Sequence, residues 1–208
     1  MARQNSNLNP ELPVSVSSRC INKDWFGMPM PEVWAIVEDF LIITERGFGL
    51  KIHSFVLMSN HFHLLVTAPN SNLHRAMQYF LSQTGRAITK SAGRVNHTWK
   101  AKYFRCQIAT HPYFQCAYKY FYRNPVVAQI CHRVEQYPYG TLSGLLGFTK
   151  LNIPVHDEVL FSDVEGTLEW LNTPTHPENY EAIKKALRRR KFKFPRKYKN
   201  GYKGFFES

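Results

Sequence analysis

The stretch LKIHSFVLMSNHFHLLVT, residues 50–67, decides the fold. Residues 50–58 and 61–67 consist mainly of β-branched, aromatic and other apolar residues, which favour β-strands. Ser59-Asn60 lies between them and is typical of a tight turn. The stretch therefore predicts two antiparallel strands joined by a short turn.

On either side of this hairpin the sequence alternates between strand and helix patterns. Residues 14–21 alternate apolar and small polar side chains, which indicates a strand, and residues 103–109 indicate another. Helices are expected over residues 31–46, 72–90 and 112–124. The order β-α-β-β-α-β followed by a helix predicts the split βαβ, ferredoxin-like fold, an α+β arrangement with two helices on one face of an antiparallel sheet.

Composition divides the chain into four segments. Residues 1–13 are polar, and we expect them to be loose. Residues 14–149 hold the predicted domain. Residues 150–183 form an acidic segment, interrupted by prolines, that we expect to wrap the domain, and a helix is expected at about 178–190. Residues 184–208 form a basic, aromatic tail.

The chain of 208 residues carries a net charge of +12, and the charge is unevenly distributed. Between Arg46 and Val134 there are 12 Lys and Arg residues and no Asp or Glu. Between Lys184 and Phe206 there are 11 more basic residues, again without an acid, whereas residues 135–181 hold 8 acidic residues and 1 basic one. Such asymmetry indicates a polyanionic partner, of which nucleic acid is the commonest.

The aromatic residues of the tail are interleaved with its basic residues. This pattern is typical of a segment that becomes ordered on nucleic acid. The alternatives are that the tail docks on the acidic segment, or that it is a solvated tag of little functional weight. The aromatic residues are Phe192, Phe194, Tyr198, Tyr202, Phe205 and Phe206.

Composition and cysteine spacing exclude several classes of protein. With 44% hydrophobic residues and no repeat, the chain is not a collagen, a coiled coil or disordered throughout. The 4 cysteines form no CxxC pair, which excludes a zinc ribbon and fits reduced thiols in the cytosol. We see neither a secretory signal nor a stretch that is apolar enough to span a membrane, and we expect no membrane partner.

The strongest local motif is His61-Phe62-His63 on a predicted strand. Side chains alternate along a strand, so both imidazoles point to one face and Phe62 points to the other. Two histidines at this spacing are a ready pair of metal ligands. The alternative interpretation is two half-exposed histidines near a turn.

A second candidate group lies in the predicted helix before Pro125. Tyr120 and Asn124 are four residues apart, so a phenol and an amide share one helical face. A phenol can attack phosphorus if a cation neutralises the phosphate, and an amide oxygen can complete the ligand set of that cation. Alternatively, the tyrosines fill a core and Asn124 caps a following helix through Cys131. Because a residue before proline disfavours the α-helical region, we expect Asn124 at a helix end.

Three motifs together resemble a known family. They are SFVLMSNHFHLLV (residues 54–66), GRVNHTW (93–99) and YKYFYRNPVVA (118–128). In this order and at these distances they resemble the REP-associated tyrosine transposases, in the IS200/IS605-like branch of single-tyrosine HUH transposases. The resemblance covers about residues 14–147.

The resemblance implies a role for four residues. His61 and His63 match the HUH pair, Tyr120 matches the nucleophile, and Asn124 matches the third metal ligand one turn later. The implied cofactor is Mg²⁺, with Mn²⁺ as the alternative. Tyr120 would attack single-stranded DNA at a palindromic, REP-like hairpin and form a 5′-phosphotyrosine link, which a 3′-OH then reverses. Tyr118 and Tyr122 lie off this register, so we expect them to be structural or to contact DNA.

The resemblance also implies partners and a location. The partner is single-stranded or hairpin DNA, the protein is a monomer or a homodimer, and the location is a bacterial-type cytosol, in association with the nucleoid. Basic residues are expected to contact phosphates, and Trp99 and Tyr103 to stack on bases. The predicted DNA contacts are Arg19, Arg75, Arg86, Lys90, Arg94, Trp99, Lys100, Lys102, Tyr103, Arg105, Lys119 and Arg123.

Two alternatives from other functional classes stay open. One is a regulatory protein of this fold that binds DNA hairpins and lacks catalysis. The other is a metal-dependent nuclease that uses water, with His61 and His63 as ligands and the tyrosines as core. A covalent protein–DNA adduct distinguishes the transposase from both alternatives, because neither one links the protein to DNA.

Overall fold

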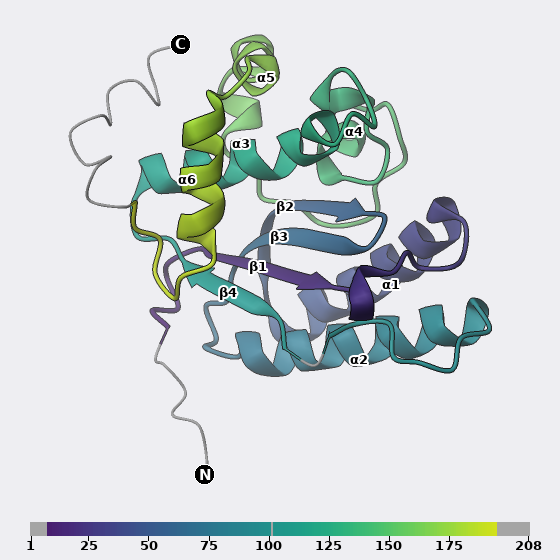
Figure 1. The fold of residues 1–208 in the computed structure, drawn as a ribbon. Coiled ribbons are helices and arrows are strands. Elements are labelled where there is room, and N and C mark those ends of the chain that lie inside the picture. Colours follow the sequence, from purple (N-terminus) through teal and green to yellow (C-terminus); the bar gives the residue numbers. More distant parts are fainter. Residues whose placement is uncertain (1–7, 101, 195–208) are drawn as a thin grey trace.

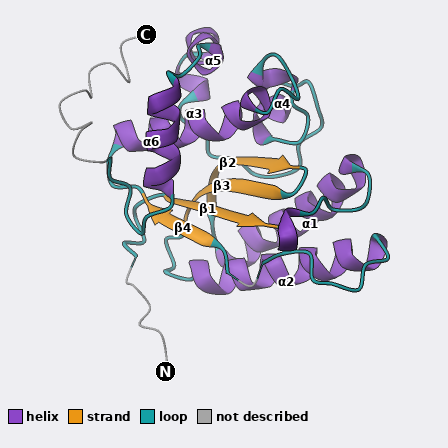
Figure 2. Ribbon diagram, in the orientation of Figure 1, coloured by secondary structure: helices purple, strands orange, loops and turns teal. Residues whose placement is uncertain are grey.

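A four-stranded antiparallel sheet organises the chain (Figures 1 and 2). The computed structural model describes residues 8–100 and 102–194. The strands lie in the order β2-β3-β1-β4, which is the ferredoxin-like order and confirms the predicted α+β fold. Their bounds are β1 Val14–Arg19, β2 Lys51–Met58, β3 His61–Thr67 and β4 Phe104–Gln107.

Six α-helices and three short 3-10 turns accompany the sheet within the described residues. The α-helices are α1 (Met30–Phe48), α2 (Leu73–Ser91), α3 (His111–Val127), α4 (Thr141–Leu145), α5 (Val164–Asn172) and α6 (Pro177–Leu187). The 3-10 turns are η1 (Ile21–Lys23), η2 (Val134–Gln136) and η3 (Leu160–Ser162).

Helices α1 and α2 cover one face of the sheet (Figure 1). Phe62, Leu64 and Val66 of β3 point into this core, as the alternation of the strand predicts. Helix α1 ends where Gly49 adopts a left-handed conformation, with φ 63°.

Helix α3 and the C-terminal helices cover the other face (Figures 1 and 2). Leu65 of β3 and Val56 of β2 point into this second core, where they join residues from α3, α5 and α6. The two histidines of β3 stand on the same face as Leu65. Helix α3 therefore lies on the face that the first two helices leave free, beside the histidine strand.

The chain after α3 closes around the domain at both edges of the sheet. The Leu57 N–H donates to the Tyr139 carbonyl at 2.8 Å, beside the outer edge of β2. At the opposite edge, Gln107 of β4 is bonded to residues 190–192. Phe192 and Phe194 are buried against Tyr113 rather than free in a tail, whereas the remainder of the predicted tail, from residue 195, lies outside the described residues.

No helix in the described part of the chain is both long enough and apolar enough to cross a membrane.

Candidate active site

A single cavity of about 920 Å³ brings the four predicted site residues together. His61 and His63 enter it from β3, and Tyr120 and Asn124 enter it from α3. More than 50 residues separate the two pairs in the sequence. The packing of α3 on the β2–β3 side of the sheet is what makes them neighbours.

The two histidines form a close pair against helix α3. Their ring centroids lie 5.1 Å apart with the planes nearly perpendicular. The His63 ring stacks on Phe121 at 4.8 Å and meets the edge of Tyr120 at 5.7 Å. Burial lowers the pKa of His61 to about 4, and burial holds the pKa of His63 well below its usual value. Both imidazoles are therefore neutral at pH 7 and keep a lone pair.

Asn60, in the turn of the hairpin, fixes the tautomer of His61. Its amide nitrogen donates to the Lys23 carbonyl at 2.8 Å, so its Oδ1 faces His61 Nδ1, also at 2.8 Å. An amide oxygen only accepts, so Nδ1 carries the proton. The lone pair of His61 then resides on Nε2.

Helix α3 does not end at Asn124. It continues to Val127 with Pro125 inside it, so the expectation of a helix end at Asn124, and of a cap for a following helix, is wrong. Pro125 lies in the last turn, where it removes one backbone donor only. The Asn124 amide nitrogen instead donates to the Tyr120 carbonyl at 2.7 Å, which leaves Oδ1 to face away from that carbonyl.

Tyr180 of α6 joins the two residues from α3. Its ring lies 4.9 Å from the Tyr120 ring, and its hydroxyl donates to Asn124 Oδ1 at 3.3 Å. Burial raises the pKa of the Tyr120 hydroxyl well above its ordinary value, and the neighbouring Tyr180 adds to this effect. Tyr180 is not among the residues predicted from the sequence, because a tyrosine far outside the three motifs gives no signal in a single sequence.

The four candidate residues lie in a segment of the chain that matches a known family. The family model described as "Transposase IS200 like" matches residues 31–124, a span that contains all four site residues. Over this segment the chain is similar to the IS200-like transposases. The comparison with curated proteins gave no match.

Two solved structures are similar to the chain. One is a REP-associated tyrosine transposase bound to a REP hairpin, with 15% sequence identity and a TM-score of 0.56, covering 70% of this chain and 92% of that one. The other is a proposed transposase from Deinococcus radiodurans R1, with 15% identity and a TM-score of 0.41, covering 55% of this chain and 92% of that one. The first supports the fold of the IS200-like segment.

Two further tyrosines of the IS200-like segment belong to the core. The Tyr118 hydroxyl donates to Asp157 Oδ2 at 2.6 Å, and the Tyr122 hydroxyl lies 2.8 Å from Thr141 Oγ1. Both rings are almost fully buried. Of the two roles expected for these tyrosines, the structure supports the structural one.

Trp99 also lies in the core, which corrects its prediction as a base-stacking residue. It is 6% exposed, and its indole N–H donates to Thr84 Oγ1 at 2.9 Å. Its ring packs against Phe26 and Phe62. A base would have to displace these contacts to reach it.

The predicted DNA contacts other than Trp99 fall into three groups. Arg19, Lys100 and Arg123 line the cavity. Arg94 and Lys119 are engaged within the protein, Arg94 with the Trp25 carbonyl and Lys119 over the Trp170 ring. The remaining residues do not line the cavity; they are Arg75, Arg86, Lys90 and Lys102, which are exposed, and Tyr103 and Arg105, which are partly buried.

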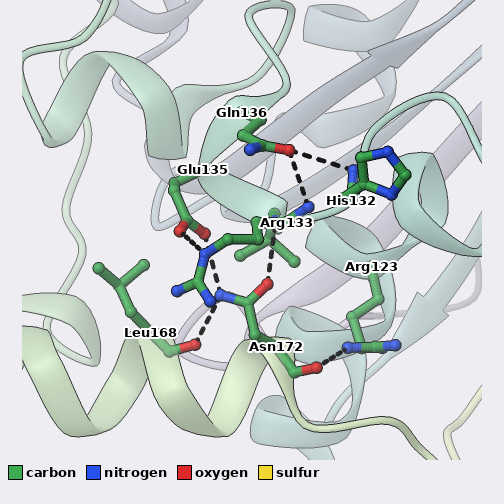
Figure 3. A network of polar contacts seen from close by, with 8 residues as sticks. Arg123, His132, Arg133, Glu135, Gln136, Leu168 and Asn172 are labelled. Carbon is green, nitrogen blue, oxygen red and sulfur yellow. Dashed lines mark hydrogen bonds and ion pairs between the residues drawn. The ribbon is translucent and has the colours of Figure 1, made fainter.

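Arg123 is held inside the protein as well as lining the cavity, and its DNA contact stays a prediction. Its Nη1 donates to the carbonyls of Leu171 and Asn172, at 2.8 and 2.7 Å, at the C-terminal end of α5. Carbonyls at a helix end lack intrahelical donors, and a cation also suits the negative end of the helix dipole. Figure 3 shows Asn172 bonded in turn to Glu135 and to the Leu168 carbonyl.

We expect Arg123→Ala to lower the free energy of unfolding by about 2 kcal/mol, because two buried carbonyls lose their donor. Urea unfolding measures this change. Arg189→Ala, at an exposed arginine, is the control and should change stability by less than about 0.5 kcal/mol. If Arg123→Ala leaves stability unchanged and lowers the salt dependence of DNA binding, Arg123 contacts DNA and does not hold α5.

Proposed function

We propose that the protein is a metal-dependent, single-stranded DNA endonuclease and strand transferase that acts through Tyr120 at hairpin DNA. The observation that carries this proposal is the shared cavity, in which two neutral imidazoles, a phenol and an amide meet among basic residues. DNA transposition, the activity of the IS200-like family, requires strand cleavage and rejoining of this kind.

The residues present fit a divalent cation. His61 offers Nε2, because Asn60 holds the proton on Nδ1. Asn124 Oδ1 accepts one hydrogen bond, from Tyr180, and an amide oxygen has two lone pairs. His61, His63 and Asn124 would hold the ion, which we propose to be Mg²⁺ or Mn²⁺. In the described ranges, 8–100 and 102–194, no three His, Cys, Asp or Glu side chains gather as a metal site.

Tyr120 would supply the nucleophile. A bound divalent cation would neutralise the scissile phosphate and make its phosphorus more electrophilic. The Tyr120 oxygen forms a bond to phosphorus as the bond from phosphorus to the 3′ oxygen breaks, which leaves a 5′-phosphotyrosine and a free 3′-OH. Because burial raises the pKa of Tyr120, the hydroxyl is protonated at rest and would lose its proton only as the new bond forms. The departing 3′ oxygen takes up a proton in the same step, so the proton count is unchanged. His61, His63 and Asn124 carry no charge as ligands, so the full charge of a bound ion would act on the phosphate.

A denaturing gel tests this function. The wild-type protein is incubated with a labelled single-stranded hairpin oligonucleotide and Mg²⁺ or Mn²⁺, and a labelled band at the protein's position is expected. Chelation of the ion should abolish the band. Cleavage without a protein-linked product would support a nuclease that uses water. Binding without cleavage in either metal would support the hairpin-binding regulator.

We expect Asn60→Ala to weaken metal binding by about 10- to 100-fold, because His61 loses the partner that fixes its tautomer. Titration of the protein with Mn²⁺, followed by electron paramagnetic resonance of the free ion, measures the affinity without DNA. Asn70→Ala is the control, since Asn70 bonds to the Phe48 carbonyl away from the cavity. Equal affinities for Asn60→Ala and wild type would show that Asn60 does not orient a ligand.

A further inference from the structure

Helix α6 lies outside the segment that matches the IS200-like family, yet it forms one wall of the cavity. Figure 1 shows it crossing α3 and reaching toward the β4 side of the sheet. Residues at helical spacing line the cavity; they are Pro177, Tyr180, Glu181, Lys184 and Leu187 of the helix and Arg188, the residue that caps its C-terminal end. These positions form one continuous face of the helix.

The other two faces of α6 have different neighbours. Ala182, Ile183 and Ala186 are buried in the core that includes α3, and they fix the orientation of the helix. Lys185 and the following Arg189 are exposed and do not line the cavity. The basic residues at this end of α6 are thus divided between a cavity face and a solvent face.

The cavity that α6 lines holds a second set of cations. Arg19, Lys23 and Lys100 line the cavity from the end of β1, from η1 and from the segment before β4. Against these three and the two cations of α6 stands a single acid of the lining, Glu181, which pairs with Lys184 at 2.7 Å. Lys184 and Glu181 are 38% and 51% exposed, so this ion pair is weak, and a phosphate can replace it.

We propose that Lys184 and Arg188 bind the phosphodiester backbone of the single strand beside the scissile phosphate, so that α6 forms one wall of the DNA track. This inference rests on the proposed function, since it assigns the DNA to the same cavity. In this assignment a strand that reaches Tyr120 lies between α6 and the cations of β1, η1 and the segment before β4.

The salt dependence of DNA binding tests the assignment, because each phosphate contact to a single strand contributes about 0.7 to the slope of log K against log salt. Fluorescence anisotropy with a short labelled oligothymidine measures this slope. All variants carry Tyr120→Phe, so that no cleavage intervenes. Lys184→Gln/Arg188→Gln is compared with Lys185→Gln/Arg189→Gln, which removes the same charge from the solvent face.

The cavity-face pair is expected to reduce the slope by about 1.4, and the solvent-face pair to leave it nearly unchanged. Lys184→Arg/Arg188→Lys keeps both charges and should keep the wild-type slope. Equal reductions by the two glutamine pairs, or no reduction by either, would overturn the assignment. Failure of the proposed function appears elsewhere, as a wild-type protein that forms no covalent adduct while the slopes still differ.

Discussion

The Tyr120→Phe variant is expected to form no covalent DNA adduct, and its cleavage of a single-stranded hairpin substrate is expected to fall by at least about 10³-fold. The substitution removes one oxygen atom and keeps the ring, which packs against His63 and Tyr180. Stability and DNA affinity should therefore change little. A denaturing gel with labelled DNA measures the adduct, and the size of the cleaved strand measures cleavage.

Tyr122→Phe is the matched control, because Tyr122 lies two residues further along α3 but points into the core. Its hydroxyl is paired with Thr141, and Thr141 also bonds to the backbone of Phe55, so removal of the phenol oxygen leaves Thr141 satisfied. We expect a stability loss of about 1 kcal/mol and a normal adduct. An adduct of wild-type yield from Tyr120→Phe would show that another group is the nucleophile.

The sheet and the histidine strand could be predicted from local patterns. The hairpin around Ser59-Asn60 combines apolar strands with a short polar turn, and both signals depend only on neighbouring residues. The observed β2 and β3 match the predicted strands to within one residue. Alternation along β3 then determines that His61 and His63 share a face.

Burial was harder to predict than secondary structure. Trp99 and Arg123 both have chemistry suited to nucleic acid. In the structure, however, the Trp99 indole donates to Thr84, and the Arg123 guanidinium donates to a carbonyl at the end of α5. Only the packing of α2 and α5 decides this, and that packing is set by residues distant in the sequence. The effect of Pro125 was also hard to predict, because it depends on where α3 ends. Pro125 lies in the last turn of the helix and does not end it.

The C-terminal wall of the site could not be predicted for a related reason. The pattern at residues 178–190 does predict a helix, but a helix pattern does not say what the helix packs against. Tyr180 and the cavity-facing cations acquire a role only because Ala182, Ile183 and Ala186 place α6 across α3. The net charge indicates a polyanionic partner. Only the packing of α6 determines which of the basic residues line the cavity.

The His63→Ala variant is expected to lose both activity and metal binding, with Mn²⁺ affinity reduced by more than about 100-fold. The His63 ring contacts His61 on one side and Tyr120 and Phe121 of α3 on the other. Its imidazole is neutral at pH 7, because burial lowers its pKa, so the ion need not displace a proton. Electron paramagnetic resonance of free Mn²⁺ measures the affinity, and the adduct assay measures activity.

His53→Ala separates ligand loss from the loss of a buried imidazole. His53 lies on the neighbouring strand β2, burial also lowers its pKa, and its ring contacts Thr67 and Phe114 outside the cavity. Both variants should lower stability, since each removes a partly buried ring. Only His63→Ala should release Mn²⁺, because only His63 faces Tyr120. If both variants bind Mn²⁺ as the wild type does, the histidine pair is structural. Cleavage of DNA by Tyr120 would then need a cation that other residues hold.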